Sequence, residues 1–158
     1  MQIRELLLHR LTSSQCGDST IGARVAATGK ECLWSERPSP AIDVVVIHSM
    51  SAGRCFPKDP YRLENIISIF CEYGVSSHYC ITRRGTIYRF VPDAFKAWHC
   101  GGSIMPEPDG RRNVNDFSIG VELLATAASS FTPSQYQALA VAFSRPALKA
   151  PASRPEQL

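Results

Sequence analysis

The chain has 158 residues, 44% of them hydrophobic and 20% charged, which are ordinary values for one soluble globular domain. Its formal net charge of +3 is too small to indicate a nucleic-acid-binding protein. The N-terminal run Leu6-Leu7-Leu8 is too short for a signal peptide or a membrane span. We therefore expect a cytoplasmic protein that binds neither nucleic acid nor a membrane.

Residues 1–40 are poorly patterned. A short helix is predicted over residues 2–11, a loop rich in Ser, Thr, Gly and Ala over 13–30, and an extended segment over 35–40, where two prolines disfavour helix. The six cysteines, at positions 16, 32, 55, 71, 80 and 100, include no Cys-x-x-Cys pair. In a reducing compartment we interpret them as free thiols, with disulfides or a metal cluster as the alternative.

The next elements have clearer signals. The run 42–47, which is apolar and β-branched apart from Asp43, predicts a strand covered on both faces, and it leads directly to His48. Asp59 and Pro60 have the form of a helix start, and apolar residues at helical spacing predict a helix over residues 60–73 that ends at Gly74.

Two β-type runs, 75–82 and 86–91, flank a Gly-containing turn and predict a hairpin. A long loop over 92–112 and a strand over 117–124 follow. Thr132 to Gln135 form a capping box with proline at the first helical position, and the helix after it is predicted to present an apolar face. The predicted members of that face are Tyr136, Leu139, Ala140 and Phe143.

This order of elements predicts an α/β (α+β) fold, with a mixed central sheet and flanking helices. We divide the chain into a poorly patterned N-terminal segment (1–40), a main domain (41–145) and a tail (146–158). The tail contains several prolines and no periodicity, so we expect it to be disordered.

Two side chains stand out as candidates for chemistry. His48 at a strand end is well placed to line a cleft and to bind zinc, although a hydrogen-bonded core histidine has the same local pattern. Glu122 lies among apolar strand residues, where a carboxylate is costly to bury unless it is paired or used. If it faces the cleft of His48, its pKa would suit acid–base catalysis; otherwise it points into solvent.

Four further residues are weaker candidates. His78 and His99 are interpreted as structural or substrate-contacting groups rather than metal ligands. Trp98 could stack on a sugar or pack as a partly buried aromatic residue. Asn115 could position the loop, contact substrate or cap a turn.

Taken together, these features resemble the zinc-dependent N-acetylmuramoyl-L-alanine amidases of the type-2 amidase family, which includes the peptidoglycan-recognition proteins. The resemblance covers roughly residues 42–143, and Glu122 with the Trp98-His99 pair points to the cytosolic AmpD-type branch. It rests on Val44-Val45-Val46-Ile47-His48-Ser49, Val75-Ser76-Ser77-His78-Tyr79, Arg84-Gly85-Thr86-Ile87-Tyr88, Val91-Pro92, Ala97-Trp98-His99-Cys100-Gly101, Asn115-Asp116-Phe117-Ser118-Ile119-Gly120-Val121-Glu122-Leu123 and Phe131-Thr132-Pro133-Ser134-Gln135-Tyr136.

The resemblance implies a bacterial hydrolase of cell-wall recycling that cleaves the amide between the muramoyl lactyl group and L-alanine in anhydromuramoyl peptides. It implies one zinc ion with His48 as a ligand, and Glu122 as the catalytic base. It also places Trp98, His99, Asn115 and His78 near the bound peptidoglycan fragment.

The family's other two metal ligands and an oxyanion-stabilising lysine lie in a segment that follows the last predicted helix. Nothing from residue 144 to 158 resembles that segment. We therefore expect a chain truncated at its C-terminus, without the last strand of the sheet and with an incomplete zinc site. Two functions follow: a zinc amidase, or a catalytically inactive amidase-like domain that at most binds muropeptides.

Overall fold

A computed structural model describes residues 2–10 and 19–144. Its main sheet has the spatial order β1-β5-β4-β7-β3, and the pairs are parallel except for the antiparallel pair of β4 and β5. This confirms the predicted mixed sheet. The strands are β1 (Ile3–Glu5), β3 (Val44–Met50), β4 (Tyr79–Ile81), β5 (Ile87–Arg89) and β7 (Ser118–Leu124), and a separate antiparallel pair joins β2 (Trp34–Glu36) to β6 (Phe95–Ala97).

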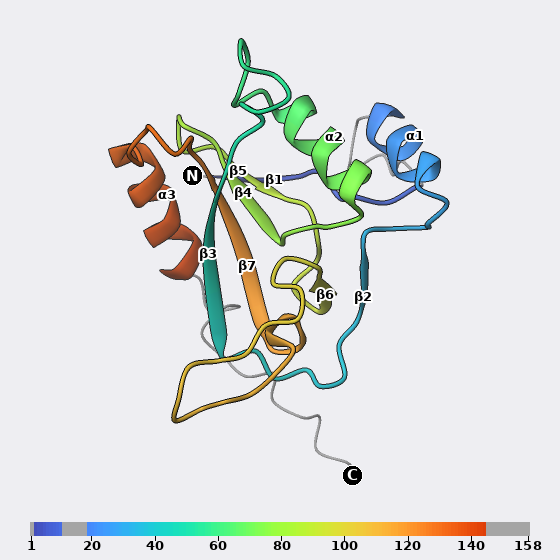
Figure 1. The fold of residues 1–158 in the computed structure, drawn as a ribbon, viewed down its shortest axis with the longest axis vertical. Coiled ribbons are helices and arrows are strands. Elements are labelled where there is room, and N and C mark those ends of the chain that lie inside the picture. Colours follow the sequence, from blue (N-terminus) through green and yellow to red (C-terminus); the bar gives the residue numbers. More distant parts are fainter. Residues whose placement is uncertain (1, 11–18, 145–158) are drawn as a thin grey trace.

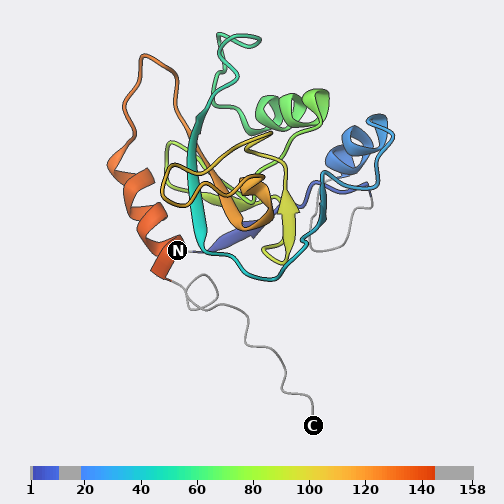
Figure 2. The same ribbon diagram turned by 60° about the horizontal axis from the view of Figure 1, so that its bottom comes forward.

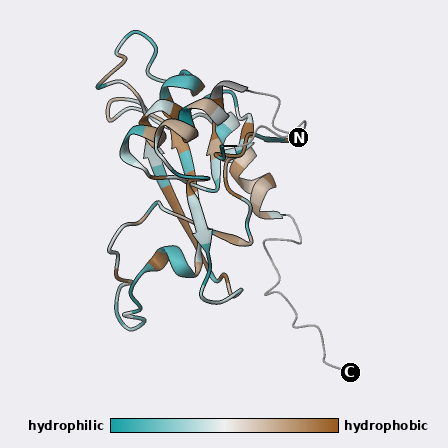
Figure 3. Ribbon diagram, turned by 90° about the vertical axis from the view of Figure 1, so that its right-hand side faces the viewer, coloured by the Kyte–Doolittle hydropathy of each residue, from teal (hydrophilic) through white to brown (hydrophobic). Residues whose placement is uncertain are grey.

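Helices cover both faces of the sheet. Helix α3 (Pro133–Ser144) lies against one face, while α2 (Leu63–Tyr73) lies on the other, with α1 (Ser19–Ala27) beyond it (Figures 1 and 2). Apolar segments concentrate on the strands, whereas polar segments are frequent in the loops that extend from the sheet (Figure 3). The result is a three-layer arrangement in which one sheet separates two apolar cores.

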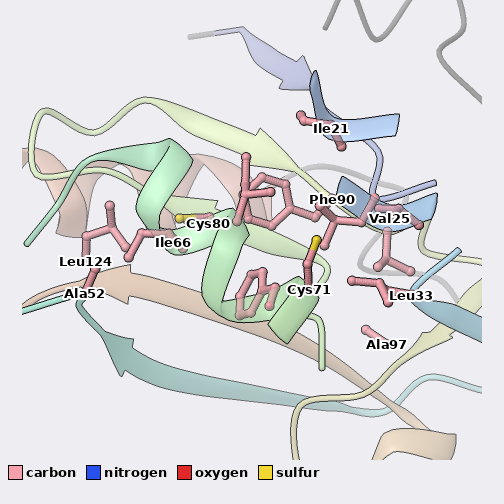
Figure 4. Packing of buried hydrophobic residues seen from close by; sticks show 14 residues of the cluster. Ile21, Val25, Leu33, Ala52, Ile66, Cys71, Cys80, Phe90, Ala97 and Leu124 are labelled. Carbon is pink, nitrogen blue, oxygen red and sulfur yellow. The ribbon is translucent and has the colours of Figure 1, made fainter. Parts of the chain in front are cut away.

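The larger core lies between the sheet, α2 and α1. Ile66 and Cys71 of α2 pack with Cys80 of β4, and Phe90 continues this layer toward Val25 of α1 (Figure 4). Helix α2 ends at Gly74, which adopts the left-handed conformation (φ 63°) that favours glycine. The predicted C-terminal end of this helix is therefore confirmed.

The smaller core lies under α3. Ala138 and Ala142 pack on the strand residues Ile119, Val121 and Leu123. The predicted capping box is present: the Gln135 N–H donates to Thr132 Oγ1 (3.1 Å), and the Thr132 N–H donates to Gln135 Oε1 (3.0 Å).

The N-terminal predictions were wrong in two places. Residues 3–5 form strand β1, parallel to β5, instead of a helix, because hydrogen bonds to β5 and burial of Leu8 outweigh local preference. Residues 19–27 form α1 instead of a loop, since Ile21 and Val25, one helical turn apart, pack against the α2 layer.

Three other predictions need correction. Helix α2 begins at Leu63 rather than Pro60, after a turn in which the Arg62 N–H donates to the Asp59 carbonyl. The expected loop 92–112 contains β6, which pairs with β2. Tyr136, expected on the apolar face of α3, is 57% exposed, and Ala140 is exposed too.

Strand β3 also differs from its prediction. It pairs with β7 alone among the described residues and forms an edge of the sheet. Its side chains at Val45 and Ile47 are 41% and 49% exposed, because α3 packs over β7 and β4. An unbroken apolar run does not distinguish a central strand from an edge strand.

The cysteines at positions 32, 55, 71, 80 and 100 are free thiols. Within the described ranges, no helix combines the length and apolar character that crossing a membrane requires. The predicted disordered tail, residues 146–158, lies outside the described residues, as does Cys16.

Gln135 provides a test of how α3 is attached. Its buried Nε2 donates to the carbonyls of Ile81 (3.2 Å) and Leu124 (3.0 Å). We expect Gln135→Leu to lower the free energy of unfolding by about 2–3 kcal/mol, because these carbonyls lose a partner inside the protein. Urea unfolding measures the change, and Gln137→Leu, an exposed position of the same helix, should change it little.

Candidate functional site

The site begins with the parallel pairing of β3 and β7. This pairing places His48 directly opposite Glu122 and Val46 opposite Gly120. Side chains alternate along a strand, so paired residues of neighbouring strands share a face. His48 and Glu122 therefore face the same side of the sheet, away from α3, as the sequence analysis required.

Glu122 is an almost fully enclosed carboxylate. Its side chain is 8% exposed, and its Oε2 has no hydrogen-bond partner among the described residues. Its pairing partners on the two sides are His48 and Cys80. Burial raises the pKa of Glu122 to about 7, because the enclosed ionised form loses its hydration.

The loop after β6 brings two further donor atoms to His48. The Nε2 atom of His48 lies 3.0 Å from Nδ1 of His99 and 4.0 Å from Sγ of Cys100. The Sγ atom of Cys100 is 3.0 Å from the same Nδ1. These three half-buried side chains hold their donor atoms within 4.8 Å of one another and could hold a metal ion.

Asn115 fixes the backbone that carries His99 and Cys100. Its Oδ1 accepts hydrogen bonds from the backbone N–H of His99 (3.1 Å) and of Cys100 (2.9 Å). Asn115 lies in the 3₁₀ turn η1 (Val114–Asp116), directly before β7. The structure thus shows Asn115 positioning the loop, which the sequence analysis gave as the alternative to substrate contact.

The ring of His99 rests on the sheet where Gly120 has no side chain. A Cβ at Gly120 would lie 2.5 Å from the His99 Cγ atom, which is too close for real atoms. On the other side of the ring, Nε2 lies 3.2 Å from Ser118 Oγ. The tautomer that carries its proton on Nε2 donates to Ser118 and leaves the Nδ1 lone pair facing His48 and Cys100.

Burial disfavours the charged form of each of the three side chains that could hold a metal ion. It lowers the pKa of His48 and, helped by the neighbouring His78 and His48 rings, lowers the pKa of His99 to about 3. Burial also raises the pKa of the Cys100 thiol, and the nearby Glu122 charge raises it further. Without a cation, the cluster is therefore held as neutral imidazoles and a thiol near pH 7.

His78 lies beneath this cluster rather than in it. It is fully enclosed: its Nδ1 accepts from the Gly120 N–H (3.0 Å), and its Nε2 lies 3.0 Å from the Phe95 carbonyl. Burial lowers its pKa to about 3, and the guanidinium of Arg37, 2.9 Å from Nε2, contributes. In this position His78 supports β7 and the β6 loop and presents no surface to a ligand.

Trp98 is the first residue after β6 and directly precedes His99. Its Nε1–H donates to Ser35 Oγ (3.2 Å), and its backbone N–H donates to Ser76 Oγ (3.0 Å). The ammonium group of Lys30 lies 4.5 Å from the centre of its ring. The ring is half-buried and packs against the larger core, which agrees with the packing interpretation of Trp98, whereas stacking on a sugar stays a prediction.

Sequence reasoning missed Cys100, Ser118 and Gly120 as parts of this site. Cys100 was grouped with five other cysteines that have no metal-binding spacing. A glycine inside a strand of otherwise apolar residues does carry a signal, because it often marks a place where another group approaches the backbone closely. At Gly120 that group is the His99 ring.

The burial of Glu122 predicts a pH-dependent stability in the metal-free protein. Its folded pKa lies above the ordinary value of 4.5, so the folded state binds the proton more tightly and loses stability as pH rises from about 4.5 to 7. The loss approaches about 3 kcal/mol above pH 7. We expect Glu122→Gln to be more stable than wild type at pH 8 and close to it at pH 4.

Urea unfolding at both pH values tests this, and subtraction of the wild type cancels the contributions of the histidines. Glu72→Gln, at an exposed position of α2, is the control and should show no such pH dependence. An equal effect of Glu122→Gln at pH 4 and pH 8 would contradict a burial-raised pKa.

A second prediction concerns Gly120. We expect Gly120→Ala to displace the His99 ring and to lower the free energy of unfolding by about 1–3 kcal/mol, because the strand backbone cannot move away from its two neighbours. Thermal unfolding measures the loss. Gly102→Ala is the matched control, since a Cβ at Gly102 meets no atom within 4 Å.

Comparisons with known proteins show what the chain is similar to. The family model for N-acetylmuramoyl-L-alanine amidase matches residues 37–148. The 1,6-anhydro-N-acetylmuramyl-L-alanine amidase AmpD of Escherichia coli (strain K12) is 47% identical over 66 residues, which are 42% of this chain and 34% of that protein. AmpD of Haemophilus influenzae is 33% identical over 123 residues, covering 67% of this chain and 62% of its own length.

A solved structure shows the same fold. The crystal structure of a selenomethionine AmpD derivative matches with a TM-score of 0.58 and 31% identity, covering 69% of this chain and 66% of that one. The chain thus spans between 34% and 62% of the length of the two curated relatives named above. The family model, in contrast, covers well over half of the chain, so this protein belongs to the N-acetylmuramoyl-L-alanine amidase family.

Proposed function

We propose that this chain is a zinc-dependent N-acetylmuramoyl-L-alanine amidase. Its substrates are peptidoglycan fragments, and it hydrolyses the amide between the muramoyl lactyl group and L-alanine. The relatives are named for action on 1,6-anhydro-N-acetylmuramyl-L-alanine, which supports anhydromuramoyl peptides of bacterial cell-wall recycling as the substrate class.

One observation carries the proposal: an enclosed carboxylate lies beside a strand histidine on one face of the sheet. Glu122 and His48 are direct partners in the β3–β7 pairing, and Glu122 Oε2 is buried without a hydrogen-bond partner in the described part of the chain. A buried carboxylate oxygen without a hydrogen-bond partner destabilises the fold. Its presence is accounted for if the site uses it for chemistry.

Glu122 is suited to carry a proton in amide hydrolysis. An enclosed carboxyl group whose pKa is raised by burial can accept a proton from the attacking water and return it to the leaving amine nitrogen. Its enclosure excludes bulk water from that transfer. The same group therefore serves first as general base and then as general acid.

The donor set fits a zinc ion. His48 supplies the ligand predicted from the sequence, and the neutral imidazoles and thiol around it are groups that zinc binds well. A bound zinc ion would polarise the substrate carbonyl and make water more acidic near pH 7. The fit is supported by convergent donors together with the unpaired Glu122 oxygen.

Trp98 and the β6 loop form the proposed edge of the substrate cleft. We assign sugar contact to the partly exposed ring of Trp98. Asn115 and His78 act from behind the loop, the first through the backbone of His99 and Cys100 and the second through Gly120. We also propose a cytoplasmic location, supported by the free thiols of the five described cysteines.

The test is an assay of the purified full chain, supplied with Zn²⁺, on an anhydromuramoyl peptide, with released L-alanyl peptide measured by mass spectrometry. Glu122→Gln should lower kcat by about 10²–10⁴-fold while zinc content stays unchanged, because the proton carrier alone is lost. Glu72→Gln on the surface of α2 should keep wild-type turnover.

Wild-type turnover in the Glu122→Gln variant would refute the assigned role of Glu122. A zinc-loaded wild-type chain without any turnover would refute the amidase proposal itself. Binding of the same peptide in that case, measured by calorimetry, would identify the chain as a muropeptide-binding domain instead.

A further inference from the structure

We propose that His48, His99 and Cys100 form a complete three-ligand metal centre in this chain, with the Cys100 thiolate as the third ligand. Zinc is the ion that this donor set fits best, because it accepts both imidazole and thiolate ligands. The use of this centre in amide hydrolysis rests on the function proposed above, whereas the binding of metal is measured without substrate.

The separations between the donor atoms carry the proposal. In four-coordinate zinc sites two nitrogen ligands lie about 3.3 Å apart, and a nitrogen and a sulfur ligand lie about 3.6 Å apart. Here the nitrogen pair is 3.0 Å apart, and Cys100 Sγ lies 3.0 and 4.0 Å from the two nitrogens. Each separation is within about 0.6 Å of the tetrahedral value, which side-chain rotation alone can adjust.

Hydrogen bonds among these atoms do not account for their convergence. With the His99 proton on Nε2, its Nδ1 offers one in-plane lone pair, yet two potential donors, His48 Nε2 and Cys100 Sγ, lie 3.0 Å from it. One lone pair accepts one good hydrogen bond, so only one of these two atoms can form a hydrogen bond to Nδ1. The short distance to the other atom is then not explained by a hydrogen bond. A single cation between the three atoms satisfies all of them.

Neighbouring residues orient the proposed ligands in the way that hydrogen-bond partners orient metal ligands in other proteins. A ligating histidine commonly donates its second ring N–H to a neighbouring acceptor, and Ser118 Oγ stands in that position for His99. Asn115 fixes the backbone of both loop ligands, and Gly120 leaves room for the ring. Three separate features of the fold thus hold His99 and Cys100 toward His48.

The centre keeps a position for chemistry. Three protein ligands leave the fourth zinc position open, as catalytic sites do. The Glu122 carboxylate is outside the set of converging donor atoms, so it stays free for proton transfer. The ligands come from positions 48, 99 and 100 alone, so this centre differs from the one that the family resemblance implies.

The experiment uses the full chain, stripped of metal and titrated with Zn²⁺ or Co²⁺. Wild type should bind one ion per chain by elemental analysis, and its Co²⁺ form should show an intense near-ultraviolet band from thiolate-to-cobalt charge transfer. Cys100→Ser should abolish that band and weaken Zn²⁺ binding by more than the roughly 10–100-fold that loss of an outer partner costs.

Cys32→Ser is the matched control, because Cys32 is a partly exposed free thiol outside the cluster. It should keep both the band and the affinity. His99→Gln should weaken binding as much as Cys100→Ser does, and circular dichroism of each metal-free variant checks that it is folded. If His99→Gln does not fold, the comparison of Cys100→Ser with Cys32→Ser still tests whether Cys100 is a ligand.

Asn115 gives an independent readout of positioning. Asn115→Ala should weaken Zn²⁺ binding about 10–100-fold with the charge-transfer band retained at saturating Co²⁺, because the ligands remain and only their support is lost. Asn115→Asp keeps an oxygen acceptor for the two backbone N–H groups and should restore most of the affinity.

Two outcomes overturn the centre: no metal bound to the wild-type chain, or Zn²⁺ affinity and the Co²⁺ spectrum unchanged in Cys100→Ser. Amidase turnover with zinc bound in Cys100→Ser would leave the proposed function standing and remove the cysteine from the ligand set. A thiolate-coordinated ion in wild type without turnover would establish the centre and remove the amidase function.

Discussion

The parallel pairing of β3 with β7 is the constraint on which the site depends. It spans seven residue pairs from Val44–Ser118 to Met50–Leu124 and makes His48 the direct partner of Glu122. A shift of β3 by one residue would move each of its side chains to the other face of the sheet. His48 would then lie on the face that α3 covers, and apolar side chains of β3 would lie beside Glu122. The register is stabilised because Met50 packs on the α2 side of the sheet while β7 is buried along its full length. The same packing that stabilises the fold therefore positions His48 beside Glu122.

A second set of polar contacts positions the loop after β6 beside His48 and Glu122. Arg37 donates to the carbonyls of Asn115 (3.1 Å), Asp116 (3.2 Å) and Ser118 (2.8 Å), so one guanidinium joins the chain before β3 to η1 and the start of β7. Asn115 then accepts from the backbone of the His99 loop. Buried polar groups of this kind are stabilising only when each has its partners. Within the described residues, the buried side-chain atoms without a hydrogen-bond partner are Glu122 Oε2 and Arg89 Nε. Of these two, only Glu122 belongs to the site.

The sequence predicted those parts of the fold whose signals are local. Helix α2 with Gly74, the β4–β5 hairpin, β7 and the Thr132–Gln135 capping box all follow from periodicity or from turn and cap residues. Strand β1, helix α1 and strand β6 were missed because partners distant in the chain determine them. The His48–Glu122 pair was predicted through family resemblance. Cys100 was not, since its position beside His48 and His99 depends on where the loop folds back, and no spacing in the sequence encodes that.

Electrostatics links the two proposals. Burial raises the pKa of Glu122 and of Cys100, and the Glu122 charge raises the pKa of Cys100 further, because the two groups would repel each other if both were ionised. Neutral imidazoles of His48 and His99 cannot compensate, because burial keeps them uncharged. A divalent cation between His48, His99 and Cys100 would replace this repulsion by attraction and allow both carboxylate and thiolate to exist near pH 7. The ion would thus offset part of the cost of enclosing Glu122 that the metal-free fold carries.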